Sequence, residues 1–440
     1  MTLAAEIEPR APSITVLGRS FALPRKWPTH RLLSGAEQVL TSLISMLGLI
    51  AFSRILDVSS FGILGGALGI ALIVQFIHDS LTISPFIVVC PEPENDQRTF
   101  GDWLVWHFAV AAIMSLALFG LGWSLIDIVP GFAQQVMWAG PILLGAAVYS
   151  FSRRMHHHWD ELVHLITQTG LYGLVYIVGI YLFWSTGSIS ATSAATVLAL
   201  AYGLPGLIFC IRNCLRARFS SGGLTRVLSS WQLISSLGGS SALWQSSYAS
   251  AQILLSLVGT PAAVAIFTVT RTLERPIGLI ISSVLDVDTS RAARAFAGGN
   301  SQAFQRMVRR TGLTLLALSG APIAVMLLFP ELFLGLLYGD SYADATLELR
   351  MRILVLVPLL ATAPLSVGLT VLRDTGYLLR INLVGLAAGL SFLSGCYLFG
   401  TIDAATANAS LVVMQLAILP FLFFRYRMLI RQPDPKEVDV

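Results

Sequence analysis

The sequence predicts an all-α polytopic membrane protein, and two observations lead to that class. Of its 440 residues, 55% are hydrophobic and 12% are charged, whereas about 25% of the residues of a soluble globular protein are charged. Apolar segments of about 18 residues or more recur along the whole chain, each long enough to cross a bilayer as a helix. These segments lack the period-2 alternation of barrel strands, which excludes a transmembrane β-barrel.

Twelve spans are predicted, separated by polar or charged turns. We place them at residues 32–53, 60–82, 103–126, 132–152, 161–184, 190–211, 230–257, 261–285, 311–337, 353–372, 380–400 and 403–424. Residues 1–31 form a polar N-terminal tail in which we expect no cleavable signal. Residues 428–440 form a second polar tail.

Positive charge is distributed asymmetrically among the predicted loops. All of the 28 lysines and arginines except five fall on the side of the two tails. Arg54, Arg350 and Arg352 fall on the opposite side, and Arg271 and Arg275 fall inside a span. The positive-inside bias therefore predicts that both termini are cytoplasmic. The cationic loops also account for the net charge of +4 without a nucleic-acid partner.

Arg271 and Arg275 lie within the eighth predicted span, which begins near Pro261. A rise of 1.5 Å per residue places Arg271 roughly 15 Å deep, near the middle of a ~30 Å hydrocarbon core. A cation at that depth costs a few kcal/mol or more, so it faces a partner or a hydrated cavity and often marks a transport path. We predict that these two arginines bind an anionic substrate. An ion pair with a nearby acid is the alternative.

Polar side chains recur at intervals of three or four residues in spans one and seven, and so share one helical face. The residues that we predict to line a central cavity are Gln38, Thr41, Ser45, Ser241, Gln245, Tyr248 and Gln252. Such residues also join membrane helices by hydrogen bonds, and this second explanation stays open.

The polar spans are the first two of each half of the chain. This placement predicts two six-helix lobes, residues 32–218 and 219–427, around a central cavity, as in transporters built from repeats.

Four further ionisable residues lie in or near the polar spans: Glu37, His78, Asp79 and Glu274. Intramembrane acids often carry a proton or a metal cation. We therefore consider these residues for coupling to a proton or sodium gradient, or for ion pairing. The cysteines and the run of histidines from His156 to His158 lack the arrangement of a metal site, so we predict no metal and no cofactor.

Several short segments resemble Wzx-type polysaccharide flippases. Phe52–Leu56 followed by Phe61-Gly62 looks like the turn after their first span, and Leu336–Tyr342 resembles the end of their ninth span. Thr268–Pro276 resembles their entry into span eight, and Asp79–Leu81 their short acidic break after span two. With the twelve-span layout, the likeness extends from about residue 31 to 426. The chain departs from the pattern at residues 87–89, where apolar residues replace the polar ones that follow the break in many members.

This resemblance, to a branch of the multidrug/oligosaccharidyl-lipid/polysaccharide exporter superfamily, implies a function. Such flippases move undecaprenyl-diphosphate-linked oligosaccharides across the bacterial inner membrane by alternating access, for exopolysaccharide, O-antigen or capsule assembly. The implied partners are the lipid-linked oligosaccharide, membrane lipids and a polysaccharide polymerase or export machinery. The implied role of Arg271 and Arg275 is to hold the diphosphate or acidic sugars.

Two other functions are compatible with the pattern. A cation-coupled multidrug antiporter of the same superfamily is the main alternative, although deep arginines fit a cationic substrate poorly. A membrane-embedded polysaccharide polymerase is the weaker one, because the predicted outer loops are short and the inner loops lack paired acids for catalysis. We therefore expect a transporter and not an enzyme.

Overall fold

The computed structural model describes residues 13–16, 19–22, 29–90, 96–159, 161–219, 222–297, 301–372, 374–400 and 402–430. These residues are almost entirely helical, which confirms the predicted all-α class. The exception is an antiparallel hairpin in the N-terminal tail, formed by β1 (Ser13–Val16) and β2 (Arg19–Ala22).

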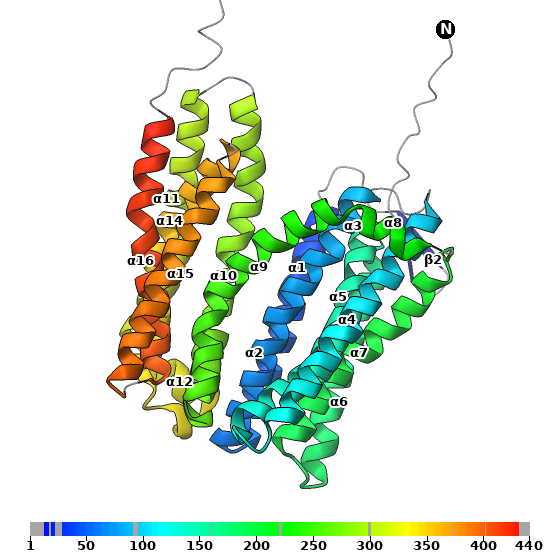
Figure 1. Cartoon of the computed structure of the whole chain (residues 1–440), viewed down its shortest axis with the longest axis horizontal. Helices are drawn as coiled ribbons and strands as arrows, with labels where there is room; N and C mark the ends of the chain where they lie inside the picture. The colour runs from blue at the N-terminus through cyan, green and yellow to red at the C-terminus, as the bar shows by residue number, and fades with distance from the viewer. Residues whose placement is uncertain are drawn as a thin grey trace, which may run out of the picture.

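The helices form two bundles that stand side by side (Figure 1). The N-terminal bundle contains α1 (Thr29–Ile55), α2 (Val58–Leu81), α3 (Ile83–Val89), α4 (Gln97–Leu125), α5 (Pro130–His158), α6 (Leu162–Ser185), α7 (Ala191–Cys214) and α8 (Gly223–Ser229). The C-terminal bundle contains α9 (Trp231–Val258), α10 (Pro261–Ala297), α11 (Ser301–Leu328), α12 (Pro330–Tyr338), η1 (Asp340–Tyr342), α13 (Thr346–Leu354), α14 (Leu356–Val371), α15 (Thr375–Leu398) and α16 (Ala404–Leu429).

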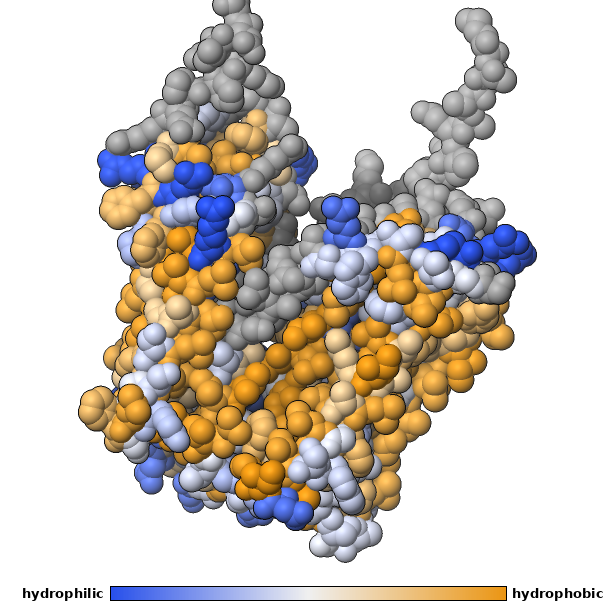
Figure 2. Space-filling model, viewed as in Figure 1, coloured by the Kyte–Doolittle hydropathy of each residue, from blue (hydrophilic) through white to orange (hydrophobic). Residues whose placement is uncertain are grey.

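Ten helical segments of the described chain are long and apolar enough to cross a membrane. The other two predicted spans correspond to α9, with 28 residues, and α10, with 37. Charged residues lower the hydropathy of α10, and several side chains of α9 lie outside those that the structure describes. Apolar side chains cover the flanks of both bundles and hydrophilic ones gather at the two ends (Figure 2), as expected for a membrane-spanning protein.

Two predicted boundaries differ from the observed ones. The ninth span was predicted at residues 311–337, but α11 begins at Ser301 and ends at Leu328. Pro330 starts a separate helix, α12, because the residue before a proline is disfavoured in the helical region. The lobe boundary was predicted at residues 218 and 219. The next helix, α8, still packs on the N-terminal bundle, where Arg226 pairs with Asp102 of α4.

Polar side chains cap corresponding helices in the two bundles. Ser190 opens α7 and Asp403 opens α16, each with a reciprocal capping box that satisfies backbone N–H groups at the helix start. These helices are the sixth span of each bundle, and each also carries an internal proline. The shared signals agree with two bundles of related design.

The bundles separate at one end and meet at the other (Figures 1 and 2). The end at which α1 begins and α16 finishes is called the terminus side here, and the other end the far side. On the terminus side the surface is hollowed between the bundles. On the far side, Arg54 of α1 donates to the carbonyl of Leu337 in α12 at 2.8 Å. The rings of Phe61 and Tyr342 also pack edge to face there, with their centroids 6.2 Å apart. The structure is thus open toward the terminus side and closed at the far side.

Candidate functional site

The helices α1, α2, α9 and α10 meet where the two bundles face each other. A glycine-rich face of α2 allows this approach. A Cβ atom at Gly65 would lie 2.2 Å from Oγ1 of Thr268, and one at Gly69 would lie 1.7 Å from Nε2 of Gln252. Real Cβ contacts are never that short, so only glycine lets α9 and α10 pack this closely on α2.

Arg271 lies on α10 at this junction. Its Nη1 donates to Oε1 of Gln252 at 2.5 Å, and Nε2 of Gln252 donates to the carbonyl of Gly65 at 3.1 Å. Gln252 is 2% exposed, so it holds the arginine from within the interface. Arg271 and Gln252 also line a small cavity of about 20 Å³ between the bundles, together with Arg275. This chain of hydrogen bonds runs from the C-terminal bundle to the backbone of the N-terminal bundle.

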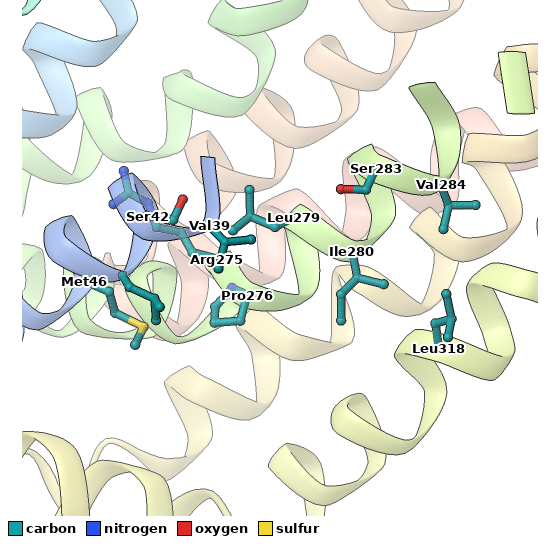
Figure 3. Close-up of a pocket in the computed structure, with 11 residues that line it drawn as sticks. Val39, Ser42, Met46, Arg275, Pro276, Leu279, Ile280, Ser283, Val284 and Leu318 are labelled. Atoms are coloured by element: carbon teal, nitrogen blue, oxygen red, sulfur yellow. The ribbon is translucent and has the colours of Figure 1, made fainter. Parts of the chain in front are cut away.

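Arg275 follows one helical turn later. Its Nη1 donates to Oγ of Ser45 on α1 at 2.9 Å, which makes a second contact between the bundles. Arg275 also lies at a groove of about 360 Å³ whose lining comes from α1, α10 and α11 (Figure 3). The lining is largely apolar, and Val39, Leu43 and Leu318 are exposed, so the groove opens onto the apolar surface of the molecule.

Neither deep arginine has a carboxylate partner among the residues that the structure describes. Glu274, one residue from Arg275, instead forms an ion pair with Arg352 of α13. Arg352 is 7% exposed and also stacks over the Phe267 ring at 5.4 Å. Glu274 thus acts on Arg271 only from a distance, and within the described part of the chain neither deep arginine forms an ion pair, in a span where an unpaired cation is costly.

Glu37 lies inside the N-terminal bundle, away from the two deep arginines. Arg153 of α5 binds it with two hydrogen bonds, Nε to Oε1 at 3.0 Å and Nη2 to Oε2 at 2.7 Å. Thr41 and Thr169 each donate to Oε1 at 2.7 Å. This carboxylate is 2% exposed, fully paired and hydrogen-bonded, which is the arrangement that a buried charge needs.

His78 and Asp79 also lie inside the N-terminal bundle. His78 Nδ1 is 3.1 Å from Asp79 Oδ1, and its Nε2 is 3.1 Å from the carbonyl of His107. Asp79 accepts a further hydrogen bond from Ser150 at 3.3 Å. The contacts connect α2, α4 and α5 and do not reach α10.

The three residues of span one that were predicted to line a cavity lie in three different environments. Gln38 is exposed, Thr41 points into the N-terminal bundle, and Ser45 contacts Arg275. In span seven, Gln252 contacts Arg271. The side chains of Ser241, Gln245 and Tyr248 lie outside those that the structure describes.

Sequence reasoning missed Arg153, Arg352 and the α2 glycines as parts of these arrangements. Arg153 and Arg352 were counted as loop cations because they lie near predicted span ends, and hydropathy does not reveal a partner on another helix. The glycines carried a usable signal. Gly62, Gly65, Gly66 and Gly69 repeat at intervals of three and four residues, the spacing of a close helix–helix contact in membranes.

The geometry fits recognition of an anion by two guanidinium groups. Arg271 and Arg275 lie about 6 Å apart along the axis of α10, at 1.5 Å per residue. Each makes one hydrogen bond through Nη1 to a neutral side chain, and a guanidinium has five N–H donors. Phosphate oxygens accept such donors in a bidentate fork. Both arginines thus have N–H donors of the kind that bind phosphate beyond the bonds they make here. The cavity that they line in this conformation, about 20 Å³, has room for about one water molecule, so a larger anion requires the bundles to move apart.

Solved structures share this architecture. The lipid II flippase MurJ, in an inward closed conformation, superposes with a TM-score of 0.72 and 10% identity over 90% of this chain and 87% of that one. An inward-facing multidrug resistance MATE family transporter of the MOP superfamily gives 0.68 and 17% identity over 89% of this chain and 94% of the other. The chain has the MATE-like fold of the MOP-superfamily transporters.

A MOP superfamily transporter from Pyrococcus furiosus, described by the reverse polarity of its binding pocket, has the same fold. Its TM-score is 0.59, with 14% identity over 92% of this chain and 99% of that one. No protein-family model and no curated protein sequence matches the chain. These likenesses show the fold that MOP-superfamily transporters share, and membership of the Wzx-type branch stays a hypothesis.

Proposed function

We propose that this protein is a flippase that moves an undecaprenyl-diphosphate-linked oligosaccharide across the bacterial inner membrane for polysaccharide assembly. The observation that carries the proposal is the pair Arg271 and Arg275, which lies between the bundles and hydrogen-bonds, within the described chain, to the neutral side chains of Gln252 and Ser45. A diphosphate supplies the anionic partner that balances the charge of these two arginines. Gln38 of α1, which is exposed, then hydrogen-bonds a sugar hydroxyl group.

The groove beside Arg275 fits the other half of such a substrate. A lipid-linked oligosaccharide has an anionic head and a long hydrocarbon tail, which gains nothing by leaving the lipid phase. The groove is apolar, opens onto the apolar surface and ends at a guanidinium (Figure 3). It therefore accepts the tail while the head lies at the arginines.

Translocation follows from the relative motion of the bundles. We propose that the terminus side faces the cytoplasm, in line with the distribution of positive charge, so that the conformation described here receives substrate from that side. Rocking then breaks the Arg54 contact with α12 on the far side and the Arg275–Ser45 contact between the bundles. The phosphate oxygens of the substrate head then accept the Arg275 N–H donor that Ser45 accepted before.

For the P. furiosus transporter, the reverse polarity of the pocket suggests a different function. The same reasoning supports an anionic substrate for a cationic pocket in this fold. A cation-coupled multidrug antiporter is the second candidate, because a multidrug resistance transporter shares the fold. Against it, the described acids Glu37 and Glu274 are already paired with Arg153 and Arg352. The variants Glu37→Gln, combined with Arg153→Met, and Asp79→Asn test whether either acid couples transport to an ion gradient.

The test compares a host with and without the gene. Mass spectrometry of extracted lipids is expected to detect accumulation of a complete undecaprenyl-diphosphate repeat unit in the deletion strain, with loss of surface polymer. Wild-type protein and Arg350→Gln, which removes an exposed arginine on the far side, are expected to restore export. Arg271→Gln is expected not to restore it. Normal lipid and polymer in the deletion strain would exclude the flippase, and hypersensitivity to cationic drugs would then favour the antiporter.

A further inference from the structure

A second groove lies in the C-terminal bundle, apart from the arginine site. It has a volume of about 670 Å³ and is lined by residues of α11, α14 and α16. None of its lining comes from α9 or α10, the helices that border the N-terminal bundle. The groove is therefore separate from the route between the bundles.

The charged and amide side chains of this groove come from α11, whereas α14 and the C-terminal part of α16 contribute apolar and aromatic ones. Gln302, Gln305, Arg306 and Arg309 come from the first turns of α11, at the terminus side. Gly312 on the same helix lies deeper, roughly 15 Å from Gln302 at 1.5 Å per residue. That length is about half of a ~30 Å hydrocarbon core, the thickness of one leaflet.

The deeper part is apolar. Ala361 and Pro364 of α14 and Phe423 of α16 line it, and Phe423 is 47% exposed. A Cβ atom at Gly312 would lie 3.4 Å from Cγ of Pro364, in ordinary van der Waals contact, so a larger side chain at this position would extend into the deeper part of the groove. An acyl chain fits such a surface, since it has no polar group to satisfy.

The two rim arginines have no acidic partner among the residues that the structure describes. Arg306 donates through Nε to the carbonyl of Gln302 at 3.3 Å, and Arg309 is exposed. Other cations at this end are paired, such as Arg425 with Asp374 and Arg291 with Asp288. The rim therefore presents, at the terminus-side end of the groove, two positive charges without an acidic partner among the described residues.

We propose that this groove binds one anionic phospholipid of the leaflet on the terminus side. Its phosphate lies against Arg306 and Arg309, and an acyl chain lies along Gly312, Pro364 and Phe423. The occupant is a resident lipid and not the transported substrate, because the groove has no contact with Arg271 or Arg275. Bound lipid bridges α11, α14 and α16 and so stabilises the C-terminal bundle.

The experiment measures lipid binding to the purified full-length protein by native mass spectrometry. Phosphatidylglycerol and phosphatidylcholine are titrated in turn. The expected result for the wild type is one retained phosphatidylglycerol, bound about tenfold more tightly than phosphatidylcholine, because each arginine near a headgroup favours the anionic lipid. Equal affinity for the two lipids, or no retained lipid, overturns the proposal without the use of any variant.

Variants then locate the site. The double substitution Arg306→Gln and Arg309→Gln is expected to remove the tenfold preference, whereas Arg310→Gln, which changes an adjacent exposed arginine that does not line the groove, is expected to keep it. Gly312→Leu fills the deeper part and is expected to release the lipid. A double variant that binds phosphatidylglycerol as the Arg310→Gln control does would place the lipid elsewhere and overturn the assignment.

Discussion

Arg153 and Arg271 lie in different bundles of this protein and have opposite surroundings. Arg153 binds Glu37 through two hydrogen bonds inside the N-terminal bundle. Arg271 donates to the neutral amide of Gln252, at the junction between the bundles, and forms no ion pair with any acid that the structure describes. A cation that forms two hydrogen bonds to a buried carboxylate has its charge balanced within the protein. Its role is to join the two helices. A cation left without one is costly to keep, and its surroundings are suited to an anion that arrives from outside.

The largest expected effect comes from breaking the complete pair. Arg153→Met leaves the Glu37 carboxylate buried without its partner, and should destabilise the protein by about 3 kcal/mol, near the lower end for broken buried pairs. Thermal unfolding of the purified protein in detergent measures this loss. Adding Glu37→Gln to Arg153→Met should restore most of the stability, because the amide still accepts hydrogen bonds from Thr41 and Thr169.

The same double variant tests ion coupling. If Glu37 serves only to join helices, Glu37→Gln with Arg153→Met retains transport near the wild-type level. A stable double variant that no longer transports, or that transports without regard to the proton or sodium gradient, would instead assign the coupling role to Glu37. Asp79→Asn provides the matched measurement for the acid that hydrogen-bonds to His78 and Ser150.

The next effect concerns Arg271, the member of the comparison that has no carboxylate partner among the described residues. Arg271→Gln removes an unpaired charge, so it should leave thermal stability unchanged or slightly improved while export of polysaccharide falls about tenfold to a hundredfold. That range corresponds to about 1.5–3 kcal/mol for a charged hydrogen bond. Arg271→Lys should retain an intermediate activity, because it keeps the charge and loses the fork. Export at the wild-type level in both Arg271→Gln and Arg275→Gln would falsify the substrate role of these arginines.

A smaller effect is expected at the contact between Arg275 and Ser45. Ser45→Ala removes one hydrogen bond of 2.9 Å that holds α1 against α10, worth about 1 kcal/mol. The loss should shift the population of conformations by roughly fivefold away from the one described here, since the bond crosses the bundle interface. Labelling of single cysteines on the far side measures the shift. Ser42→Ala, one turn from the contact, is the control, and equal labelling of the two variants would remove Ser45 from the gating contacts.

The smallest effect concerns a paired acid outside the spans, between α5 and α6. Glu161 accepts hydrogen bonds from His156, Arg212 and Arg216. Partial burial by itself raises the pKa of this carboxyl, but these contacts outweigh it and lower the pKa from 4.5 to about 2. A lowered pKa means that the stabilisation is fully present above about pH 4.5 and is lost as the pH falls toward 2.

The measurement is the difference in melting temperature between wild type and Glu161→Gln. It should be constant from pH 7 to about pH 5 and shrink below that, by at most a few degrees since the group is near the surface. A difference that stays constant down to pH 3 would mean that the charge of Glu161 contributes nothing.

Much of the architecture was accessible from the sequence. The twelve spans were predicted because crossing a bilayer requires about 20 apolar residues in succession, a local property of the chain. The depth of Arg271 and Arg275 followed from counting along one helix. The start of α11 was missed by ten residues because its first turns carry Gln302, Arg306 and Arg309, and a hydropathy criterion does not include charged turns that lie beyond the hydrocarbon core.

The choice of partners was not accessible in the same way. Glu274 was weighed as a partner for the neighbouring arginines, yet it pairs with Arg352, 78 residues further along the chain. Glu37 was considered for ion coupling or ion pairing without a named partner, and the structure pairs it with Arg153, 116 residues away, within one bundle. Hydropathy and helical period describe one helix at a time, whereas an ion pair depends on which helices become neighbours and how they are rotated.

The sequence by itself thus determined the membrane environment, the helical class and the presence of two cations at mid-depth, because each depends on the composition of a single segment. The tertiary structure alone decided that these cations pair with none of the described acids and lie between two bundles that are open at one end. It did so through the α2 glycines, since Gly65 and Gly69 allow α9 and α10 to approach closely enough for Gln252 to occupy the place beside Arg271. Steric contact between distant segments is a property of the fold, and no single segment carries it.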